Sequence, residues 1–161
     1  MTKSRKPALQ GDIIKSQKGK SPHEKQPPKK EILIMAKNKF YICEKCGNIV
    51  EMIYDSGVNP HCCGQKMTKL EAGTVEASRE KHIPVASVDG QVVTVAVGSV
   101  EHPMAEEHSI LWVYLETDKG IQRKALEVGK APRAIFNLAD GEKPIAAYAF
   151  CNLHGLWKTE I

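Results

Sequence analysis

Four cysteines in two close pairs place the strongest constraint on this chain. They lie within residues 35–72, where Cys43 and Cys46 form a C-x-x-C pair and Cys62 and Cys63 are adjacent. A segment of fewer than ~40 residues rarely buries enough apolar surface to fold unaided. A bound metal supplies the missing free energy in such small units, because metal binding then becomes folding energy. The spacing therefore predicts a site of four thiolates around one metal ion.

The spacing does not distinguish zinc from iron in this cysteine-rich segment. Both ions suit four tetrahedral thiolates. Gly47 permits the tight turn after the first pair, whereas the adjacent Cys62 and Cys63 replace the second C-x-x-C of an ordinary zinc ribbon and force a distorted tetrahedron. We expect His61 to face solvent, since four thiolates already complete the site.

The basic charge of the chain belongs to its first 34 residues. Residues 1–34 contain nine Lys or Arg against three Asp or Glu, a balance of +6 in a chain whose total is +4. This segment is rich in Lys, Pro, Ser and Gln and has no sustained apolar period, which predicts a disordered basic extension. Lysine-rich arms can bind phosphate backbones, but this one has no aromatic residue for base stacking. A solvated extension is therefore the favoured interpretation, and nucleic acid is not an expected partner. Our hypothesis is that translation starts at Met35.

The sequence also predicts a compartment. Its apolar runs are shorter than the 18 or so residues that a membrane-spanning helix needs, and the N-terminus lacks the pattern of a secretory signal. We therefore expect a cytoplasmic, reducing setting, in which cysteines are metal ligands or nucleophiles more often than disulfides.

Short β-type runs fill the remainder of the chain, residues 73–161. Turn signals such as DG, DKG and ADGEKP separate runs that are rich in β-branched and aromatic residues, namely 91–98, 109–117, 121–128, 133–138 and 145–151. Such spacing predicts an antiparallel sandwich of immunoglobulin-like size. The expected fold class is therefore all-β, with a small metal-bound cysteine-rich ribbon (35–72) followed by an immunoglobulin-like antiparallel β-sandwich (73–161).

The run 109–117 is apolar on both faces, which predicts a central, well-covered strand. Simple alternation divides its side chains into two sets, with Leu111, Val113 and Leu115 on one face and Ile110, Trp112 and Tyr114 on the other.

Four histidines and a single cysteine share the sandwich segment. We expect each to lie in a loop or at a strand end, and a sandwich gathers its loops at two ends. One such histidine is usually a surface residue, and a lone cysteine is usually a small buried hydrophobe. The prediction of a site depends on the whole set and on its C-x-x-H spacing: His82, His102, His108, Cys151 and His154.

The number and type of these groups restrict the metal. Five ligands are too many for tetrahedral zinc. Blue copper needs an axial methionine, and none follows His154. Five nitrogen and sulfur ligands fit a square-pyramidal iron, with imidazoles in the plane, Cys151 axial and the sixth position open. An open position on a redox metal predicts that a small molecule reacts there.

Motifs in both segments identify a family. The chain from Met35 to Ile161 resembles desulfoferrodoxin, the two-iron class of superoxide reductase, through five stretches in order: YICEKCGNIVEM, PHCCGQKM, EKHIPV, VEHPMAEEHSI and CNLHG. The resemblance implies a desulforedoxin-like iron domain followed by a catalytic domain whose iron takes the four histidines and axial Cys151. It also implies superoxide reduction to hydrogen peroxide in defence against oxidative stress, a homodimer, and electrons from a rubredoxin-like donor.

The resemblance further assigns roles to Glu80 and Lys81. Superoxide is an anion, so the ammonium of Lys81 beside His82 would raise its encounter rate with the site and could place a water that donates a proton. Glu80 resembles the glutamate that occupies the sixth iron position in the oxidised resting state. Without His82 beside them, the two residues would be an ordinary solvated charge pair.

Three other functions remain as alternatives. A pure electron-transfer protein would have no open coordination position. A zinc-ribbon binding module on a sandwich would show no superoxide chemistry. A superoxide dismutase would evolve oxygen as well as peroxide, whereas a reductase consumes an external reductant.

Overall fold

A computed structural model describes residues 39–74 and 77–161. The expected basic extension (1–34) and the hypothetical start at Met35 lie outside these residues. None of the helices within the described ranges has the length and apolarity that crossing a membrane would require.

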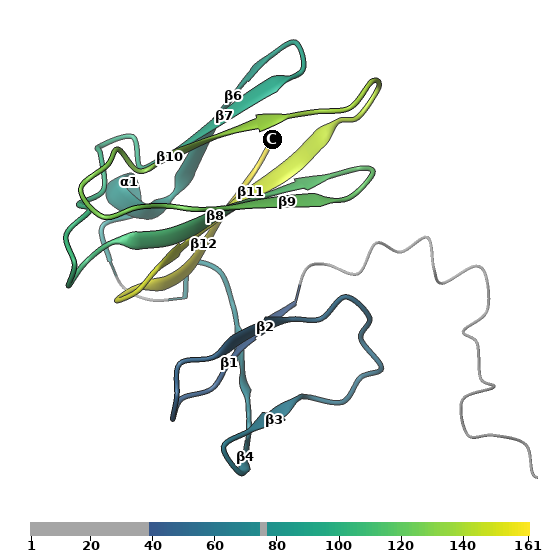
Figure 1. The fold of residues 1–161 in the computed structure, drawn as a ribbon, viewed down its shortest axis with the longest axis vertical. Helices are drawn as coiled ribbons and strands as arrows, with labels where there is room; N and C mark the ends of the chain where they lie inside the picture. The colour runs from purple at the N-terminus through teal and green to yellow at the C-terminus, as the bar shows by residue number, and fades with distance from the viewer. Residues whose placement is uncertain (1–38, 75–76) are drawn as a thin grey trace, which may run out of the picture. The chain divides into compact units, whose positions relative to one another are not determined.

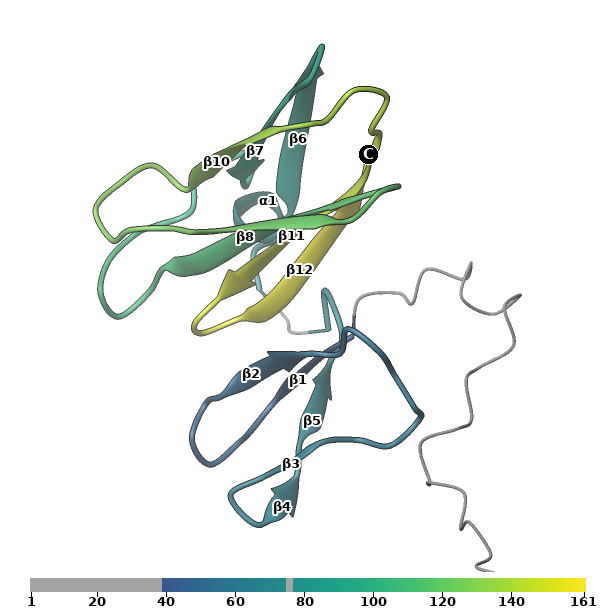
Figure 2. The same ribbon diagram turned by 45° about the vertical axis from the view of Figure 1, so that its right-hand side comes forward.

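Five short strands, β1 to β5, build the cysteine-rich part (Figure 2). Three of them form an antiparallel sheet in the order β2-β1-β5, made by β1 (Phe40–Ile42), β2 (Ile49–Glu51) and β5 (Thr68–Leu70). The other two are a small hairpin of β3 (His61–Cys62) and β4 (Gln65–Lys66). Strands of two or three residues bury little apolar surface, which agrees with the need for a metal.

Two antiparallel sheets build the sandwich, with the single-turn helix α1 (Arg79–His82) at one end (Figure 1). One sheet has the order β10-β7-β6 and consists of β6 (Pro84–Asp89), β7 (Val92–Val97) and β10 (Arg133–Asn137). The other has the order β12-β11-β8-β9 and consists of β8 (Ile110–Thr117), β9 (Ile121–Ala125), β11 (Pro144–Cys151) and β12 (Gly155–Glu160). The predicted all-β fold class is confirmed, and the division at residue 73 stays a prediction.

The apolar core of the sandwich lies between its sheets. The side chains of this inter-sheet cluster are buried and come from strands of both sheets or from the residue that follows β10: Val93, Val95, Val97, Ile110, Val113, Leu115, Ala134, Phe136, Leu138, Ala147, Ala149 and Cys151. Full burial of one large aliphatic or aromatic side chain contributes roughly 1.5–3 kcal/mol. Cys151 belongs to this cluster, so the lone thiol of the sandwich lies in its buried core.

An aromatic cluster covers the other face of the four-stranded sheet. Phe40 of β1 packs against Trp112, Tyr114 and Tyr148, with ring centroids 5.4, 5.3 and 6.0 Å away. The Tyr114 hydroxyl also donates a hydrogen bond to the Glu51 carboxylate. The cysteine-rich sheet and the sandwich therefore share one buried set of rings.

All five expected strands occur, but the sequence interpretation missed β6 and β12. Both are edge strands that pair with one neighbour each. The side chains of β6 are mostly exposed, and β12 ends in Lys, Thr and Glu. The exposed side chains of β6 and the polar end of β12 leave only a weak apolar period in the sequence.

The expected alternation along β8 is wrong at its first residues. Ile110 packs in the inter-sheet cluster together with Val113, whereas Leu111 is 42% exposed. The pairing with β11 shifts register between Phe150 and Cys151, so that Cys151 lies opposite Ile110. One extra residue in a strand resets which side each later residue faces. Leu111 is that residue.

Candidate metal centres

Five ligand-type side chains meet at one end of the sandwich. His82 ends α1, His102 lies in the loop after β7, His108 precedes β8, Cys151 ends β11 and His154 lies in the turn before β12. One potential ligand atom from each residue lies within 4.8 Å of those of the others. The structure therefore brings together the whole set of sandwich ligands that the sequence predicted, although His82 lies in a helix and not in a loop.

The four imidazole rings surround a common centre. Neighbouring rings have centroids 4.7 Å apart for His82–His102, 4.6 Å for His102–His108, 4.9 Å for His108–His154 and 4.7 Å for His82–His154. Each of these pairs is nearly perpendicular, with interplanar angles between 72° and 82°. The diagonal pair His82–His108 is farther apart, at 6.1 Å. This arrangement would let all four imidazoles bind one ion.

Backbone carbonyls determine which nitrogen two of these histidines present. The Nδ1 atom of His82 lies 2.7 Å from the Ser78 carbonyl oxygen, and Nδ1 of His102 lies 2.6 Å from that of Pro103. A carbonyl oxygen only accepts, so each Nδ1 carries the proton and each Nε2 presents a bare lone pair. These two Nε2 atoms face each other at 3.2 Å. Two lone pairs at this distance repel unless a cation binds both.

Two further nitrogens point to the same cation. Nε2 of His108 is buried and, among the described residues, has no hydrogen-bond partner. An unsatisfied buried polar atom costs about 1–3 kcal/mol, which a bound ion removes. Nδ1 of His154 lies 2.9 Å from Nε2 of His82. The donor set is therefore three Nε2 atoms and one Nδ1 atom.

The Cys151 thiol completes the group from the core side. It is fully buried, and its Sγ lies 3.5 Å from Nδ1 of His154. Burial raises the pKa of this thiol, although the backbone N–H groups of Leu153 and His154 oppose the effect. A coordinating metal ion reverses that balance, because it deprotonates a bound thiol outright.

Burial keeps the imidazoles in the neutral form that binds metal. It lowers the pKa of His82 and His108, and it lowers the pKa of His102 to about 4. The positive charge of a neighbouring histidine opposes protonation as well. At neutral pH the lone pairs of these three rings are therefore available to a cation.

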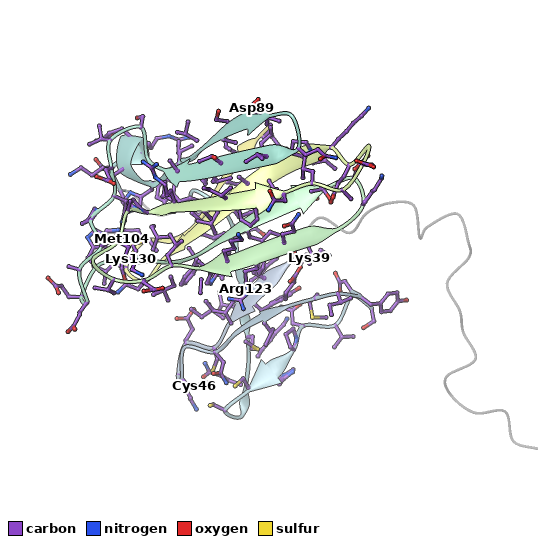
Figure 3. All side chains as sticks on the ribbon, turned by 45° about the horizontal axis from the view of Figure 1, so that its top comes forward. Lys39, Cys46, Asp89, Met104, Arg123 and Lys130 are labelled. Atoms are coloured by element: carbon purple, nitrogen blue, oxygen red, sulfur yellow. The ribbon has the colours of Figure 1, made fainter. Side chains whose placement is uncertain are left out.

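Met104 anchors the loop that carries His102 and His108. The Gly129 N–H donates to the Met104 carbonyl oxygen at 2.7 Å, and the Ile110 N–H lies 3.4 Å from the Met104 sulfur. Met104 and Lys130 lie close together at this end of the sandwich (Figure 3). The loop therefore has a fixed point between its two ligands.

A glycine that the sequence interpretation missed supports α1. Gly98 has φ +87°, and a Cβ there would lie 2.7 Å from the Lys81 carbonyl oxygen, 2.9 Å from that of Glu80 and closer still to that of Val100. Any other residue would therefore displace the backbone of α1 or of the following loop. The signal in the sequence was a glycine directly after the strand run VVTVAV.

Glu80 and Lys81 lie on α1 next to His82, and both are exposed. The Ser78 hydroxyl donates a hydrogen bond to the Glu80 carboxylate. This bond and the Glu80 backbone N–H lower the pKa of the carboxyl group, so Glu80 is ionised at neutral pH.

Asn152 is a second residue that the sequence interpretation missed. Its Oδ1 accepts from the Ser109 N–H at 2.9 Å, and its Nδ2 donates to the Glu107 carbonyl oxygen at 3.0 Å. These bonds tie the turn that bears Cys151 to the segment that bears His108. The motif CNLHG contained this residue without indicating its partner.

The four-cysteine group forms a second cluster. One sulfur from each of Cys43, Cys46, Cys62 and Cys63 lies within 4.8 Å of the others, and the Sγ atoms of Cys46 and Cys62 are 3.6 Å apart. All are free thiols. Cys43 is buried, whereas Cys46 and Cys63 are exposed. His61 is exposed as well.

Electrostatics and backbone geometry in this cluster both point to a bound cation. Backbone N–H groups lower the pKa of Cys43 to about 7, while the neighbouring thiols raise the pKa of Cys63 to about 12. Four thiolates therefore cannot all ionise without a positive ion between them. Cys63 also has φ +51°, the one positive φ of a non-glycine residue in the described ranges. The adjacent pair thus requires an uncommon backbone conformation.

The metal-free protein should lose stability as the pH falls from about 6.5 to 4. His102 has a folded-state pKa of about 4 against an ordinary value of 6.5, so the unfolded chain binds more protons in this window. The neutral His102 side chain therefore stabilises the folded state fully above pH 6.5. This stabilisation is lost as the pH falls through 4, and the free energy of unfolding drops by about 3 kcal/mol. Urea unfolding at a series of pH values measures this loss. His102→Gln should flatten the slope, and an unchanged slope in that variant would contradict the assignment; exposed His61→Gln is the matched control.

Cys43→Ser should remove the metal of the four-cysteine site and leave the five-ligand site occupied. Cys43 supplies the buried sulfur and has a pKa lowered to about 7, whereas the five-ligand site shares no ligand with it. Metal analysis of purified protein should fall by one equivalent. Loss of both metals would show that the two sites are coupled.

Comparisons with known proteins agree with both clusters. The sequence matches the family model described as Desulfoferrodoxin over residues 74–160 and that described as Desulfoferrodoxin, N-terminal domain, over residues 35–70. Together these matches cover both candidate metal sites.

Individual relatives extend over most of the chain. The protein is 43% identical over 124 residues to the desulfoferrodoxin of Syntrophotalea carbinolica, covering 77% of this chain and 97% of that one. It is 31% identical to the superoxide reductase of Pyrococcus horikoshii, covering 51% of this chain and 86% of that one. The crystal structure of the superoxide reductase from Treponema pallidum has a TM-score of 0.66 and 42% identity, covering 76% of this chain and 98% of that one. This chain therefore belongs to the desulfoferrodoxin family.

Proposed function

We propose that this chain is a superoxide reductase, which converts superoxide, one electron and two protons into hydrogen peroxide. The observation that carries this function is the five-ligand group, in which four imidazoles surround one centre and a buried thiol lies beside them. Relatives that are named superoxide reductases support the same reaction.

The five donors fit an iron ion. The four imidazoles and the thiolate would hold the ion and would leave room for a further ligand, and a soft thiolate with imidazoles suits iron. When bound, the iron supplies the one-electron chemistry where that further ligand binds. Cys151 holds the ion from the core side, where its Sγ is fully buried. His108 and His154 are only partly buried, so a small anion reaches the group from solvent.

Lys81 and Glu80 act at the solvent side in this proposal. The exposed ammonium of Lys81, one residue from His82, attracts superoxide and holds a water that donates a proton. Electrostatic steering can raise association rates toward ~10⁸–10⁹ M⁻¹s⁻¹. Glu80, exposed on α1 two residues before His82, is the carboxylate that would bind at the solvent side of the metal in the oxidised protein. The hydrogen bond from Ser78 and the lowered pKa of Glu80 keep this carboxylate ionised and ready to bind.

The four-cysteine group holds a second iron in the same proposal. Its two exposed thiols give an electron donor direct access to the site. The family matches over 35–70 and 74–160 support a division into a desulforedoxin-like domain (35–72) and a catalytic domain (73–161).

We also propose a homodimer in the cytoplasm that takes its electrons from a rubredoxin-like carrier. The resemblance of the sequence to the family supports the dimer and the donor. Five free cysteines support a reducing compartment. Native mass spectrometry tests the dimer.

Stopped-flow mixing of the reduced, iron-loaded protein with superoxide tests the reaction itself. A reductase yields peroxide, oxidises one iron per superoxide and releases no oxygen. Oxygen release with catalytic turnover in the absence of reductant would show a dismutase instead.

Lys81→Ile should slow the second-order reaction with superoxide by about tenfold or more and weaken its dependence on salt, because the steering charge is lost. Rates at several ionic strengths measure both effects. Lys143 is an exposed lysine that precedes β11, at the opposite end of that strand from Cys151, so Lys143→Ile is the matched control. Equal rates for the two variants would remove Lys81 from the mechanism.

Cys151→Ser should abolish the reaction with superoxide even where iron stays bound, since a hydroxyl does not replace thiolate donation to the metal. Metal content and stopped-flow rates on the same sample separate loss of iron from loss of activity. Cys46→Ser alters the other site and should react at nearly the parent rate. A fully active Cys151→Ser protein would refute the role of Cys151 as a metal ligand.

A further inference from the structure

Trp157 is a large, fully buried side chain that lies outside all three apolar clusters. It is 2% exposed and ranks first by volume among the fully buried side chains. None of the clusters formed by the described residues includes it. A residue of this size normally fills an apolar core. Because Trp157 does not, its contacts with other residues indicate its role.

One face of the Trp157 indole lies against a metal-ligand candidate. Its ring and the His82 imidazole are stacked, with centroids 4.9 Å apart and planes inclined by 26°. His82 is itself buried, at 2% exposure. The indole therefore covers one face of the buried imidazole.

The polar edge of Trp157 contacts a second ligand residue. Its Nε1–H donates a hydrogen bond to the His154 carbonyl oxygen at 3.1 Å. His82 and His154 are 72 positions apart in the sequence. One side chain thus contacts two ligand residues that come from different elements.

The β11–β12 hairpin explains how Trp157 reaches this position. Gly155, with φ +68°, ends the turn after His154 and starts β12. Gly155 pairs with Cys151, and Trp157 pairs with Ala149. Paired residues point to the same side of a sheet, so Trp157 lies on the side that carries the Cys151 thiol.

Stacking adds a restraint on the face of the His82 ring to the hydrogen bond at its edge. The bond from Nδ1 to the Ser78 carbonyl oxygen fixes one atom of the ring. That bond acts at the edge of the ring, whereas the indole lies against its face. A flat indole in van der Waals contact therefore opposes tilting of the imidazole toward it.

We propose that Trp157 is a positioning residue for the five-ligand metal site. Its indole sets the plane of His82 and anchors the turn of His154, so that both nitrogens point at the ion before it binds. This inference rests on the proposed metal-binding role of the five residues and is independent of the substrate. Residues that orient metal ligands typically change metal affinity 10- to 100-fold when they are altered.

Cobalt(II) titration tests the role without any measurement of activity. The full chain carries Cys43→Ser and Cys46→Ser in every sample, so that the visible cobalt bands report the five-ligand group alone. Trp157→Leu removes the flat ring, whereas Trp157→Phe keeps a ring face and removes the hydrogen-bond donor. Phe136→Leu shortens a buried ring of the inter-sheet cluster and is the matched control for a loss of packing.

We expect Trp157→Leu to weaken cobalt binding about 10- to 100-fold and to shift the ligand-field and thiolate bands. Trp157→Phe should stay within about threefold of the parent, because the stacked face remains. Phe136→Leu should lower the unfolding midpoint and leave affinity and bands unchanged. If Trp157→Leu does not fold, Trp157→Met replaces it, because methionine fills most of the volume without a flat ring. The same loss of affinity and the same band shifts are expected for it.

Two results would overturn the positioning role. The first is a leucine or methionine variant with the parent's affinity and bands, which would leave Trp157 as packing alone. The second is a phenylalanine variant as weak as the leucine variant, which would show that the stacked face is not the cause. Failure of the parent to bind cobalt at the five ligands would overturn the proposed function as well, so the two failures are distinguishable.

Discussion

The facing Nε2 atoms of His82 and His102 repel each other unless a cation binds between them, and the rest of this end of the sandwich depends on that interaction. Backbone carbonyls hold both Nδ1 protons, so two bare lone pairs meet at 3.2 Å, and the buried Nε2 of His108 adds a third without a partner. Such a group is costly when empty and favourable around a cation. The anchored loop, the glycine beneath α1 and the core-bound thiol all keep these donors in place.

The two metal centres relate to the fold in opposite ways. The five-ligand group lies at the end of a large apolar core, and Cys151 is part of that core. The protein framework therefore orients its ligands. The four-cysteine group lies among strands of two or three residues, with two of its thiols exposed. There the metal supplies folding energy to the segment, and the aromatic cluster around Phe40 adds apolar contact with the sandwich.

Ligand types could be predicted from the sequence far better than strand geometry. Cysteine and histidine are few in this chain, so their spacing indicated both sites and the resemblance supplied their grouping. Strands β6 and β12 were missed because β6 is mostly exposed and β12 ends in polar residues, which weakens their apolar period. The bulge at Leu111 left no local signal, since its cause is the pairing of β8 with β11. The contact between Trp157 and His82 left no local signal either, because the two residues meet only in the tertiary structure.

The sequence by itself determined which chemical groups are available: five cysteines, the clustered histidines, and a charged pair beside one of them. Residue types and their short-range spacing are properties of the covalent chain, so the sequence specifies them without the fold. Only the tertiary structure decided which nitrogen each histidine presents, that the Cys151 sulfur faces the core, and that an indole from β12 lies on a ring from α1. These depend on hydrogen bonds and packing between segments far apart in the chain, which exist only once the strands have paired.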